Sequence, residues 1–324
     1  MTLRLGLVGG GWISRQHLDA LQRLGRTELI GVVAGSRATA DEVTAQWGGT
    51  SYDDLDRMLE AGRPDVVYVA VPPHRAVGVA ERLVAHRIPF LTEKPLSALD
   101  AEGPARLAEV IEQNRLVVAV GYHLRALDMM PEVRARLAAK PAQLFVARWL
   151  DSTPEPAWWG RTDQGGGQVV EQATHLYDLA RYLVGDATVV GAASTRDLAT
   201  STPEVDVADS SAAIIRFESG AVGSLANTRK ISTAVIEVEI VSDGLLTRLS
   251  KHPDRGQGDW HASFDDGTVI RAISAECDPY EKQAAAFLDA VEWADPGGVL
   301  CTYEDALRTY SLTRSVVAAT GAPG

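Results

Sequence analysis

A turn of three glycines between a short apolar run and a helical pattern places the strongest constraint on the fold of this chain. Gly9–Gly11 follows the apolar residues 3–8 and precedes apolar positions spaced as in a helix. The first glycine permits a tight turn, the third lets the backbone approach a phosphate, and Ser14 is small enough for close helix–strand packing. The N–H groups that open the helix then bind phosphate. This context predicts a dinucleotide site rather than a merely structural glycine turn.

Strand and helix patterns alternate over residues 1–120. Residues 65–70 form a nearly continuous apolar run, which is typical of a parallel strand covered on both faces. Repeated β-α-β units indicate a doubly wound parallel sheet, so we expect residues 1–120 to form a Rossmann domain. The remaining expected strands are 3–8, 29–33, 88–91 and 116–120, and the expected helices after the first are 38–47, 77–85 and 101–113.

The end of the second expected strand bears on the choice of cofactor. An acidic residue there would bind the ribose 2′-hydroxyl of NAD, but the chain has Ser36 and Arg37, with no carboxylate before Asp41. Arg37 suits bidentate pairing with a 2′-phosphate, and Ser36 can donate to it. We therefore expect NADP(H), with NAD(H) the alternative if Arg37 is only a solvated helix-start residue. The expected cofactor site comprises Gly9, Gly11, Trp12, Ile13, Ser36, Arg37, Pro72, Glu93 and Lys94.

The pattern changes in the second expected domain, residues 121–324. Strands follow one another without helices between them, which predicts an open antiparallel sheet in an α+β domain. One face of such a sheet is covered by helices and the other often needs a partner, so we expect a homodimer or homotetramer. Residues 217–221 suit a hairpin turn. The expected strands are 144–150, 188–193, 210–217, 222–227, 234–242 and 245–249, with helices at 132–139, 279–293 and 304–319.

Two segments carry candidate chemistry. Glu93-Lys94-Pro95 ends a strand of the first domain, where a lysine can reach a substrate oxygen. In the second domain, a glycine-led helix carries Glu171 and His175, four residues apart and thus on one helix face. A histidine beside a carboxylate suits general acid–base catalysis, although alone it is more often a packed structural residue. With the nucleotide fold, we predict Lys94, His175 and Glu171 as catalytic.

Substrate contacts are expected from two places. Tyr122 and Arg125 follow the last strand of the first domain, and Trp158 and Trp159 precede the glycine run. Indole faces stack well on sugar rings. The alternative role for the two tryptophans is loop anchoring or an oligomer contact. The alternative for Arg125 is an internal salt bridge. We expect His17 to be structural.

The composition excludes other partner classes. The net charge of −12, from 31 basic and 43 acidic residues, disfavours nucleic acid and anionic membranes. Cys277 and Cys301 form no metal-like cluster and are expected to be reduced thiols. The first expected strand begins at residue 3, so we expect no secretory signal. No apolar run is long enough for a membrane span. We expect a cytoplasmic protein that binds a small molecule and no metal.

These motifs and their order resemble the Gfo/Idh/MocA oxidoreductase family over nearly the whole chain. The closing segment Asp278-Pro279-Tyr280 adds to the resemblance. It implies hydride transfer between NAD(P) and a sugar, anhydrosugar or cyclitol, with Lys94 on the reacting oxygen, a cis peptide before Pro95, and His175 as acid–base. The family usually has Asp at Glu171 and Gly at Ala173, and often Pro-Asn-x-x-His where this chain has Pro72-Pro73-His74-Arg75-Ala76.

Two further functions remain open from the sequence. One is a ketoreductase acting on a modified or nucleotide-linked sugar. The other is a non-catalytic NADP-sensing regulator, against which the retention of Lys94 and His175 argues.

Overall fold

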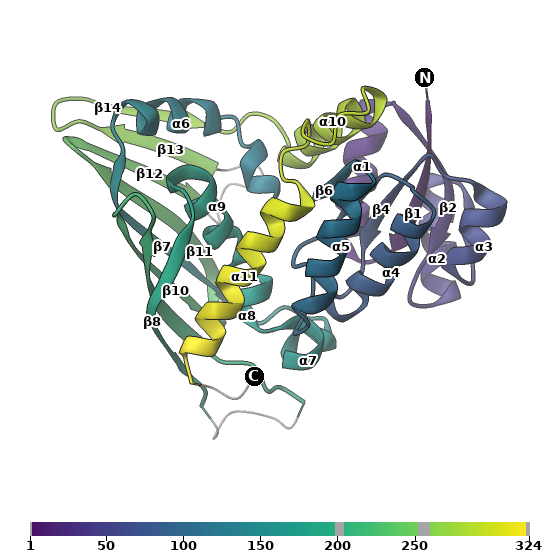
Figure 1. The fold of residues 1–324 in the computed structure, drawn as a ribbon, viewed down its shortest axis with the longest axis horizontal. Helices are drawn as coiled ribbons and strands as arrows, with labels where there is room; N and C mark the ends of the chain where they lie inside the picture. Colours follow the sequence, from purple (N-terminus) through teal and green to yellow (C-terminus); the bar gives the residue numbers. More distant parts are fainter. Residues whose placement is uncertain (1, 198–203, 252–259, 322–324) are drawn as a thin grey trace. The chain divides into compact units, whose positions relative to one another are not determined.

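The computed structural model describes residues 2–197, 204–251 and 260–321. The chain forms two compact units (Figure 1). The first comprises Met1–His123 and Pro279–Leu307, and the second comprises Leu124–Asp278 and Arg308–Gly324. The chain therefore returns to the first unit after building most of the second.

The first unit contains a six-stranded parallel sheet in the order β3-β2-β1-β4-β5-β6. The order reverses direction between β1 and β4, which is the switch point where such sheets bind ligands at their carboxyl ends. The strands are β1 Leu3–Gly9, β2 Thr27–Val33, β3 Thr50–Tyr52, β4 Val66–Ala70, β5 Phe90–Thr92 and β6 Val118–Val120. The helices are α1 Trp12–Leu24, α2 Arg37–Trp47, α3 Leu55–Arg57, the π-helix η1 Met58–Gly62, α4 Pro73–Ala85, α5 Glu102–Gln113 and α10 Pro279–Glu292.

Helix α10 packs on α1 and completes the core of the first unit. Phe287 and Leu288 are fully buried in the same cluster as Leu21. Arg26 pairs with Asp289 at 2.7 Å at the rim of this contact. The apolar face of α10 is thus the reason that residues far along the chain pack with the N-terminal sheet.

The second unit contains an eight-stranded sheet in the order β14-β13-β12-β11-β7-β10-β9-β8. All its neighbouring strands are antiparallel except β7 and β10, which pair in parallel. The strands are β7 Ala142–Ser152, β8 Ala187–Thr195, β9 Ser210–Phe217, β10 Val222–Thr228, β11 Lys230–Ser242, β12 Leu245–Lys251, β13 Trp260–Asp265 and β14 Ile270–Ser274. The helices are α6 Met130–Ala139, α7 Thr162–Gly165, α8 Gln168–Glu171, α9 Thr174–Val184 and α11 Tyr303–Ala319, with 3-10 turns η2 His123–Ala126 and η3 Ala157–Gly160.

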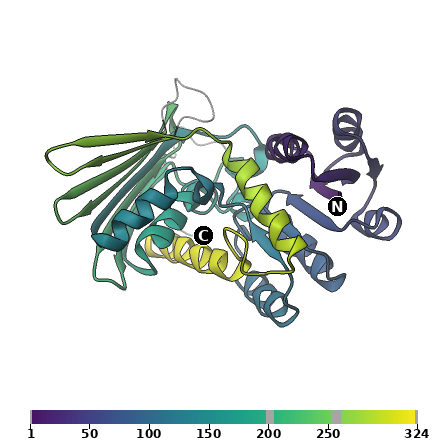
Figure 2. The ribbon, with the colours of Figure 1, turned by 90° about the horizontal axis from the view of Figure 1, so that it is seen from above.

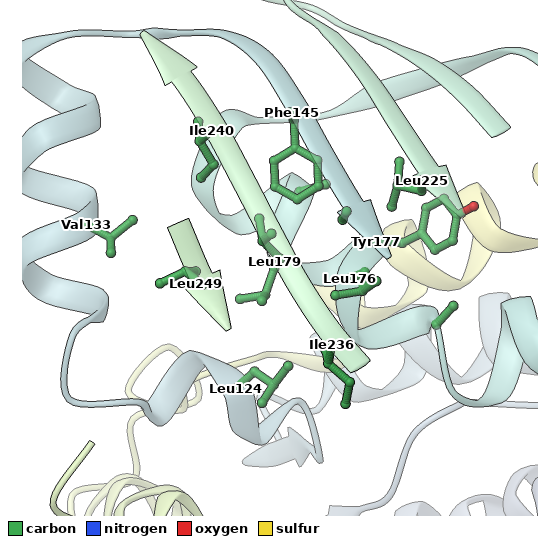
Figure 3. Packing of buried hydrophobic residues seen from close by; sticks show 14 of the residues in the cluster. Leu124, Val133, Phe145, Leu176, Tyr177, Leu179, Leu225, Ile236, Ile240 and Leu249 are labelled. Atoms are coloured by element: carbon green, nitrogen blue, oxygen red, sulfur yellow. The ribbon is translucent and has the colours of Figure 1, made fainter. Parts of the chain in front are cut away.

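Helices α6, α9 and α11 cover one face of this sheet (Figure 2). Alternate residues of the strands meet them, as the period of two along a strand requires. Phe145 of β7, Ile240 of β11 and Leu176 of α9 lie together in this core (Figure 3). The opposite face carries exposed ion pairs such as Arg148–Glu237.

The structure confirms the parallel sheet, the mostly antiparallel sheet and the hairpin between β9 and β10, where Gly220 has a φ of +90°. Among the described elements, eight short ones were not predicted: β3, α3, η1, η2, η3, α7, β13 and β14. None of the described helices is long and apolar enough to cross a membrane.

Candidate functional site

The turn between β1 and α1 fits the pyrophosphate of a dinucleotide. Gly9 has a φ of +137°, and a Cβ there would lie 2.4 Å from the carbonyl oxygen of Ala70. Gly11 caps α1, and a Cβ built there would have no atom within 4 Å, so the open helix end is accessible to a ligand. No acidic residue occupies the first turn of α1, so the N–H groups keep their attraction for anions. Trp12 is exposed at this end, and Ser14 is fully buried below it.

Arg37 and Ser36 lie at the end of β2, as expected, but both already have partners. Ser36 caps α2 by accepting a hydrogen bond from the N–H of Thr39. Arg37 pairs with Asp41 at 3.0 Å and with Asp53 at 3.1 Å, and its side chain is 57% exposed. These carboxylate hydrogen bonds raise the pKa of Arg37 further above its ordinary value. A ligand phosphate would therefore compete with two carboxylates for this guanidinium.

Lys94 follows β5 at the carboxyl edge of the sheet, the edge that also carries the glycine turn. It is half-buried and precedes a cis peptide bond to Pro95, as the family resemblance implies. Glu93 before it is buried, and its N–H donates to the carbonyl of Val69 at 2.8 Å. Pro72 caps α4 after β4 at the same edge.

The carboxylate of Glu93 is held inside the first unit by His17. The distance from His17 Nε2 to Glu93 Oε1 is 2.8 Å, and both side chains are buried. Burial alone would raise the pKa of Glu93, but the hydrogen bond and charge of His17 hold it below its ordinary value. Lys94 and His123 lower this pKa further. The carboxylate beside Lys94 is therefore ionised at neutral pH.

Aromatic rings enclose this pair. The ring of His17 meets Tyr68 edge-on at 5.3 Å and Tyr280 at 5.4 Å between centroids. Tyr280 also stacks on His123 at 4.6 Å. Burial raises the pKa of Tyr68, so its phenol stays neutral beside the Glu93–His17 pair. His17 was expected to be structural, and the structure adds that it orients a residue of the Lys94 segment.

In the second unit, the predicted single helix bearing Glu171 and His175 is wrong. Helix α8 ends at Glu171 and α9 begins at Thr174. The N–H of Ala173 donates to the carbonyl of Gln168, five residues back, and this wider turn interrupts the α-helical spacing. Four-residue helical spacing therefore does not align Glu171 with His175.

Glu171 instead accepts a hydrogen bond from the indole of Trp159. The Nε1–Oε2 distance is 2.7 Å, and Trp159 is only 1% exposed. Gly165 lies against the same segment, where a Cβ would be 3.3 Å from the carbonyl oxygens of Trp158 and Trp159. The buried Trp159 thus anchors the loop to α8, whereas Trp158 is half-buried. A sugar contact through either ring remains a prediction.

His175 is buried on α9 and stacks on Trp149 of β7. The ring centroids are 5.7 Å apart and the planes differ by 18°. Trp149 was not among the predicted site residues. Its position was nonetheless visible in the sequence, because it lies two residues after Ala147 and four after Phe145, on the face of β7 that faces the helices.

Arg125 and Asp178 form a buried bidentate ion pair within the second unit. Arg125 Nε donates to Oδ2 at 2.8 Å and Nη2 donates to Oδ1 at 2.6 Å. Thr309 also donates to this carboxylate, at 3.2 Å. The pair matches the internal salt bridge that was the alternative for Arg125. Tyr122, in the first unit, is 1% exposed, so direct substrate binding by either residue stays a prediction.

The described residues contain no group of three His, Cys, Asp or Glu side chains placed to hold a metal ion. Cys301 is buried and Cys277 exposed, and neither forms a disulfide bond.

Two family models match the chain. Residues 3–122 match the oxidoreductase family with an NAD-binding Rossmann fold, and residues 142–244 match the GFO/IDH/MocA C-terminal domain. The inositol 2-dehydrogenase of Rhizobium meliloti is 23% identical over 98% of this chain and 99% of its own. The rhizopine catabolism protein MocA of Rhizobium meliloti is 28% identical, over 56% of this chain and 57% of MocA.

Solved structures of low sequence identity share the fold. A levoglucosan dehydrogenase in complex with NADH superimposes with a TM-score of 0.87 at 20% identity, covering 99% of this chain and 97% of that one. The 3-ketoreductase KijD10 from Actinomadura kijaniata, in complex with NADP and TDP-benzene, gives a TM-score of 0.86 at 20% identity, covering 98% of each chain. The nicotinamide cofactors of these two structures differ.

Proposed function

Because the chain belongs to the Gfo/Idh/MocA family of oxidoreductases, we propose that it transfers hydride between NADP and a hydroxyl or ketone carbon of a sugar, anhydrosugar or cyclitol. The observation that carries this proposal is Lys94, which stands half-buried at the carboxyl edge of a dinucleotide-type sheet beside an ionised Glu93. Relatives named inositol 2-dehydrogenase and levoglucosan dehydrogenase support the substrate class.

The first unit supplies the cofactor groups and one reacting side chain. The glycine turn binds the pyrophosphate through the N–H groups of α1. A bound nicotinamide supplies the carbon that accepts or gives the hydride. Lys94 Nζ donates a hydrogen bond to the reacting oxygen and stabilises the negative charge that develops there. The Glu93 carboxylate keeps the Lys94 segment in place and offsets positive charge nearby.

The second unit supplies the proton acceptor. In the oxidation direction, a ring nitrogen of His175 takes the hydroxyl proton of the substrate. In the reduction direction, the same nitrogen returns it to the alkoxide. Glu171, held by Trp159, is the third proposed catalytic residue and orients the substrate. We also propose direct substrate contacts from Tyr122, Arg125 and Trp158.

Single substitutions test these roles. Lys94→Ala and His175→Ala should each lower kcat by a factor on the order of 100 or more, since general acid–base groups contribute about 10²–10⁴-fold. Binding of NADP, followed by fluorescence, should change little. A panel of inositols, monosaccharides and anhydrosugars is assayed at 340 nm. Near-normal turnover by both variants would remove the assignment, and tight NADP binding without any turnover by the wild type would favour a sensing protein.

Cofactor preference depends on Arg37. We propose that a 2′-phosphate replaces Asp53 and Asp41 as the acceptor of its N–H groups, which makes NADP(H) the preferred cofactor. NAD(H) is the second candidate, because the ion pairs with Asp41 and Asp53 already occupy the guanidinium of Arg37.

Arg37→Ala should lower kcat/KM for NADP about 10–100-fold and leave kcat/KM for NAD unchanged. This range corresponds to the loss of a charge-assisted hydrogen bond of about 1.5–3 kcal/mol. Asp53→Asn, which weakens the competition, should raise kcat/KM for NADP. A higher kcat/KM for NAD in the wild type would favour the second candidate.

We also propose that the open face of the eight-stranded sheet associates two or four copies of the chain. Val146 and Ile214 are exposed on this face, between ion pairs such as Arg248–Glu239. Light scattering on the purified protein measures the mass directly, and a monomer at micromolar concentration would contradict this part of the proposal.

A further inference from the structure

The helix-covered face of the second sheet changes character near the end of β7. One row across the sheet is wholly apolar and buried: Ala213, Leu225, Ala147, Val238 and Leu249. The next row toward the end of β7 is Ser211, Asn227, Trp149 and Ile236. Three of these side chains carry hydrogen-bonding groups, so the row is not a continuation of the core. At this row the helix-covered face of the sheet changes from apolar to polar.

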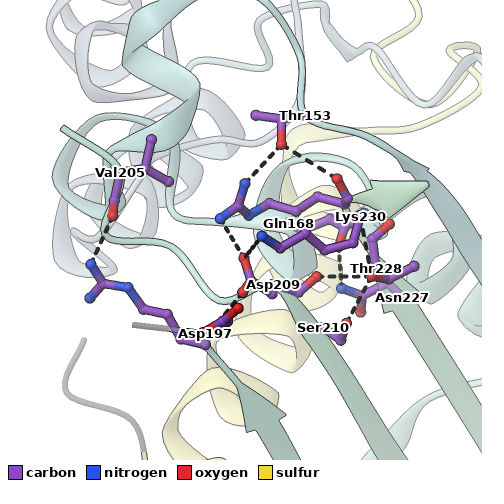
Figure 4. A network of polar contacts seen from close by, with 11 residues as sticks. Thr153, Gln168, Asp197, Val205, Asp209, Ser210, Asn227, Thr228 and Lys230 are labelled. Carbon is purple, nitrogen blue, oxygen red and sulfur yellow. Dashed lines mark hydrogen bonds and ion pairs between the residues drawn. The ribbon is translucent and has the colours of Figure 1, made fainter. Parts of the chain in front are cut away.

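The polar groups of this row form hydrogen bonds with one another and with Gln168 of α8, with one exception. Ser211 donates to Asn227 at 2.8 Å, and Asn227 donates to Gln168 at 2.8 Å. Gln168 in turn donates to the carbonyl of Thr228 at 2.7 Å, in the network drawn in Figure 4. Trp149 Nε1 is buried, and no atom of the described residues accepts its hydrogen bond.

A buried indole N–H without an acceptor is unfavourable, because it has lost its hydrogen bond to water without replacing it. The group stands beside the proposed proton acceptor, because the indole and the His175 ring are stacked nearly parallel. Hydrogen bonds from both rings lie close to the ring planes. A substrate that places its reacting oxygen at a ring nitrogen of His175 therefore places a neighbouring oxygen at the edge of the Trp149 indole that carries the N–H.

The charges around the row indicate what kind of oxygen this is. Arg229 and Lys230 follow the strand end, but both pair with Asp209, and Arg229 also donates to Thr153 (Figure 4). Lys251 lies two strands away from Trp149, on β12. A phosphate or carboxylate would need an adjacent cation, whereas an indole N–H suits an uncharged hydroxyl, ether or carbonyl oxygen.

We propose that Trp149 is a substrate-binding and specificity-determining residue, whose Nε1–H donates to an uncharged ring oxygen or hydroxyl next to the reacting carbon of a neutral polyol or monosaccharide. This inference rests on the proposed oxidoreductase function and narrows its substrate to an unphosphorylated ring at this position. Asn227 and Gln168 hold the row in place, and Trp149 makes the contact.

Steady-state kinetics of Trp149→Phe test the contact, because phenylalanine keeps an aromatic ring for stacking and lacks the N–H. With the best substrate among myo-inositol, D-glucose and levoglucosan, KM should rise about tenfold, as expected for one lost hydrogen bond. The KM for the nicotinamide cofactor should stay the same, and kcat should change by less than about threefold, because the bond is made equally to ground and transition state. Trp260→Phe, in the same row beyond Lys251, is the matched control and should leave both KM values unchanged.

Deoxy analogues identify the oxygen. The analogue that lacks it should react equally well with wild type and Trp149→Phe, whereas other deoxy analogues keep the tenfold difference. Equal KM values for Trp149→Phe and wild type with an active substrate would overturn the inference and leave the proposed function intact. Absence of turnover by the wild type across the panel would instead count against the proposed function.

A second measurement does not depend on turnover. In protein labelled with ¹⁵N-tryptophan, the indole signal of Trp149 is identified from Trp149→Phe or, if that variant does not fold, by elimination with the other tryptophans. Addition of the polyol to the NADPH-bound protein, which cannot react, should shift this signal and leave that of Trp260 unchanged. A signal that responds to no polyol would show that the N–H binds only a water molecule.

Discussion

Gly121→Ala is the sharpest test of the buried Glu93–His17 pair. Gly121 follows β6, and its N–H donates to the carbonyl of Thr92 at 2.9 Å. A Cβ on this residue would lie 2.6 Å from Oε1, 2.7 Å from Cδ and 2.8 Å from Oε2 of Glu93. The carboxylate would have to move, because real Cβ contacts are not this short. Its freedom to move is limited by His17, to which it is bonded at 2.8 Å.

The expected loss of stability is that of the hydrogen bond between Glu93 and His17. A hydrogen bond to a charged group contributes about 1.5–3 kcal/mol. The change from glycine to alanine restores about 0.4–1 kcal/mol through the unfolded chain, since the φ of Gly121 is not in the left-handed region. We therefore expect Gly121→Ala to lower the free energy of unfolding by about 1–2 kcal/mol, measured by urea denaturation. Cofactor binding should weaken as the Lys94 segment shifts.

Two control variants separate the effect of the steric clash with Glu93 from the general effect of replacing glycine by alanine. Gly78→Ala lies on the exposed side of α4 with no atom within 4 Å of its new Cβ, so it should raise stability by about 0.5–1 kcal/mol. In a Glu93→Ala background the obstructing carboxylate is absent, and Gly121→Ala should then be neutral or slightly stabilising. An unchanged free energy of unfolding for Gly121→Ala, or the same loss in both backgrounds, would refute the reasoning.

Two further predictions concern buried charges. Arg125→Ala leaves Asp178 charged and buried without its guanidinium, so the free energy of unfolding should fall by about 3–5 kcal/mol. Arg148→Ala breaks an exposed pair and should lower the free energy of unfolding by less than about 1 kcal/mol. Similar losses in the two variants would contradict this prediction. The folded pKa of Glu93 lies below its ordinary value of 4.5, so its contribution to stability is complete above that pH and is lost as the pH falls toward the folded pKa. Glu93→Gln should flatten the acid side of a plot of denaturation midpoint against pH, and an unchanged acid slope would argue against an ionised Glu93.

Much of the first unit was predictable because each strand is a compact apolar run. Residues 65–70, for example, are covered on both faces, which leaves an unmistakable pattern, and the structure has β4 there. The edge strand β3 escaped prediction because it has three residues, Thr50–Tyr52, and little apolar content. Strand β14 was missed for a related reason, since Ile270–Ser274 is exposed along most of its length.

The candidate site was predictable in its residues more than in its contacts. Lys94 and the glycine turn were visible because chemistry requires those residue types at those positions. The wide turn at Ala173 was not visible, because no residue at that point forbids a continuous helix. Nor does any local pattern show that Tyr280 closes over His17, since the two are brought together only when α10 packs on α1. Long-range packing of this kind is absent from a single sequence.

The parallel pairing of β7 with β10 has a consequence for how the second unit folds. Two adjacent central strands that run in the same direction cannot be joined by a hairpin, and here the whole of residues 153–221 intervenes between them. Closing so long a connection has a large entropic cost before any contact compensates for it, which slows folding. That connection carries Trp159, Glu171 and His175. We therefore expect the proposed catalytic segment to become ordered late in folding, once β7 and β10 have paired.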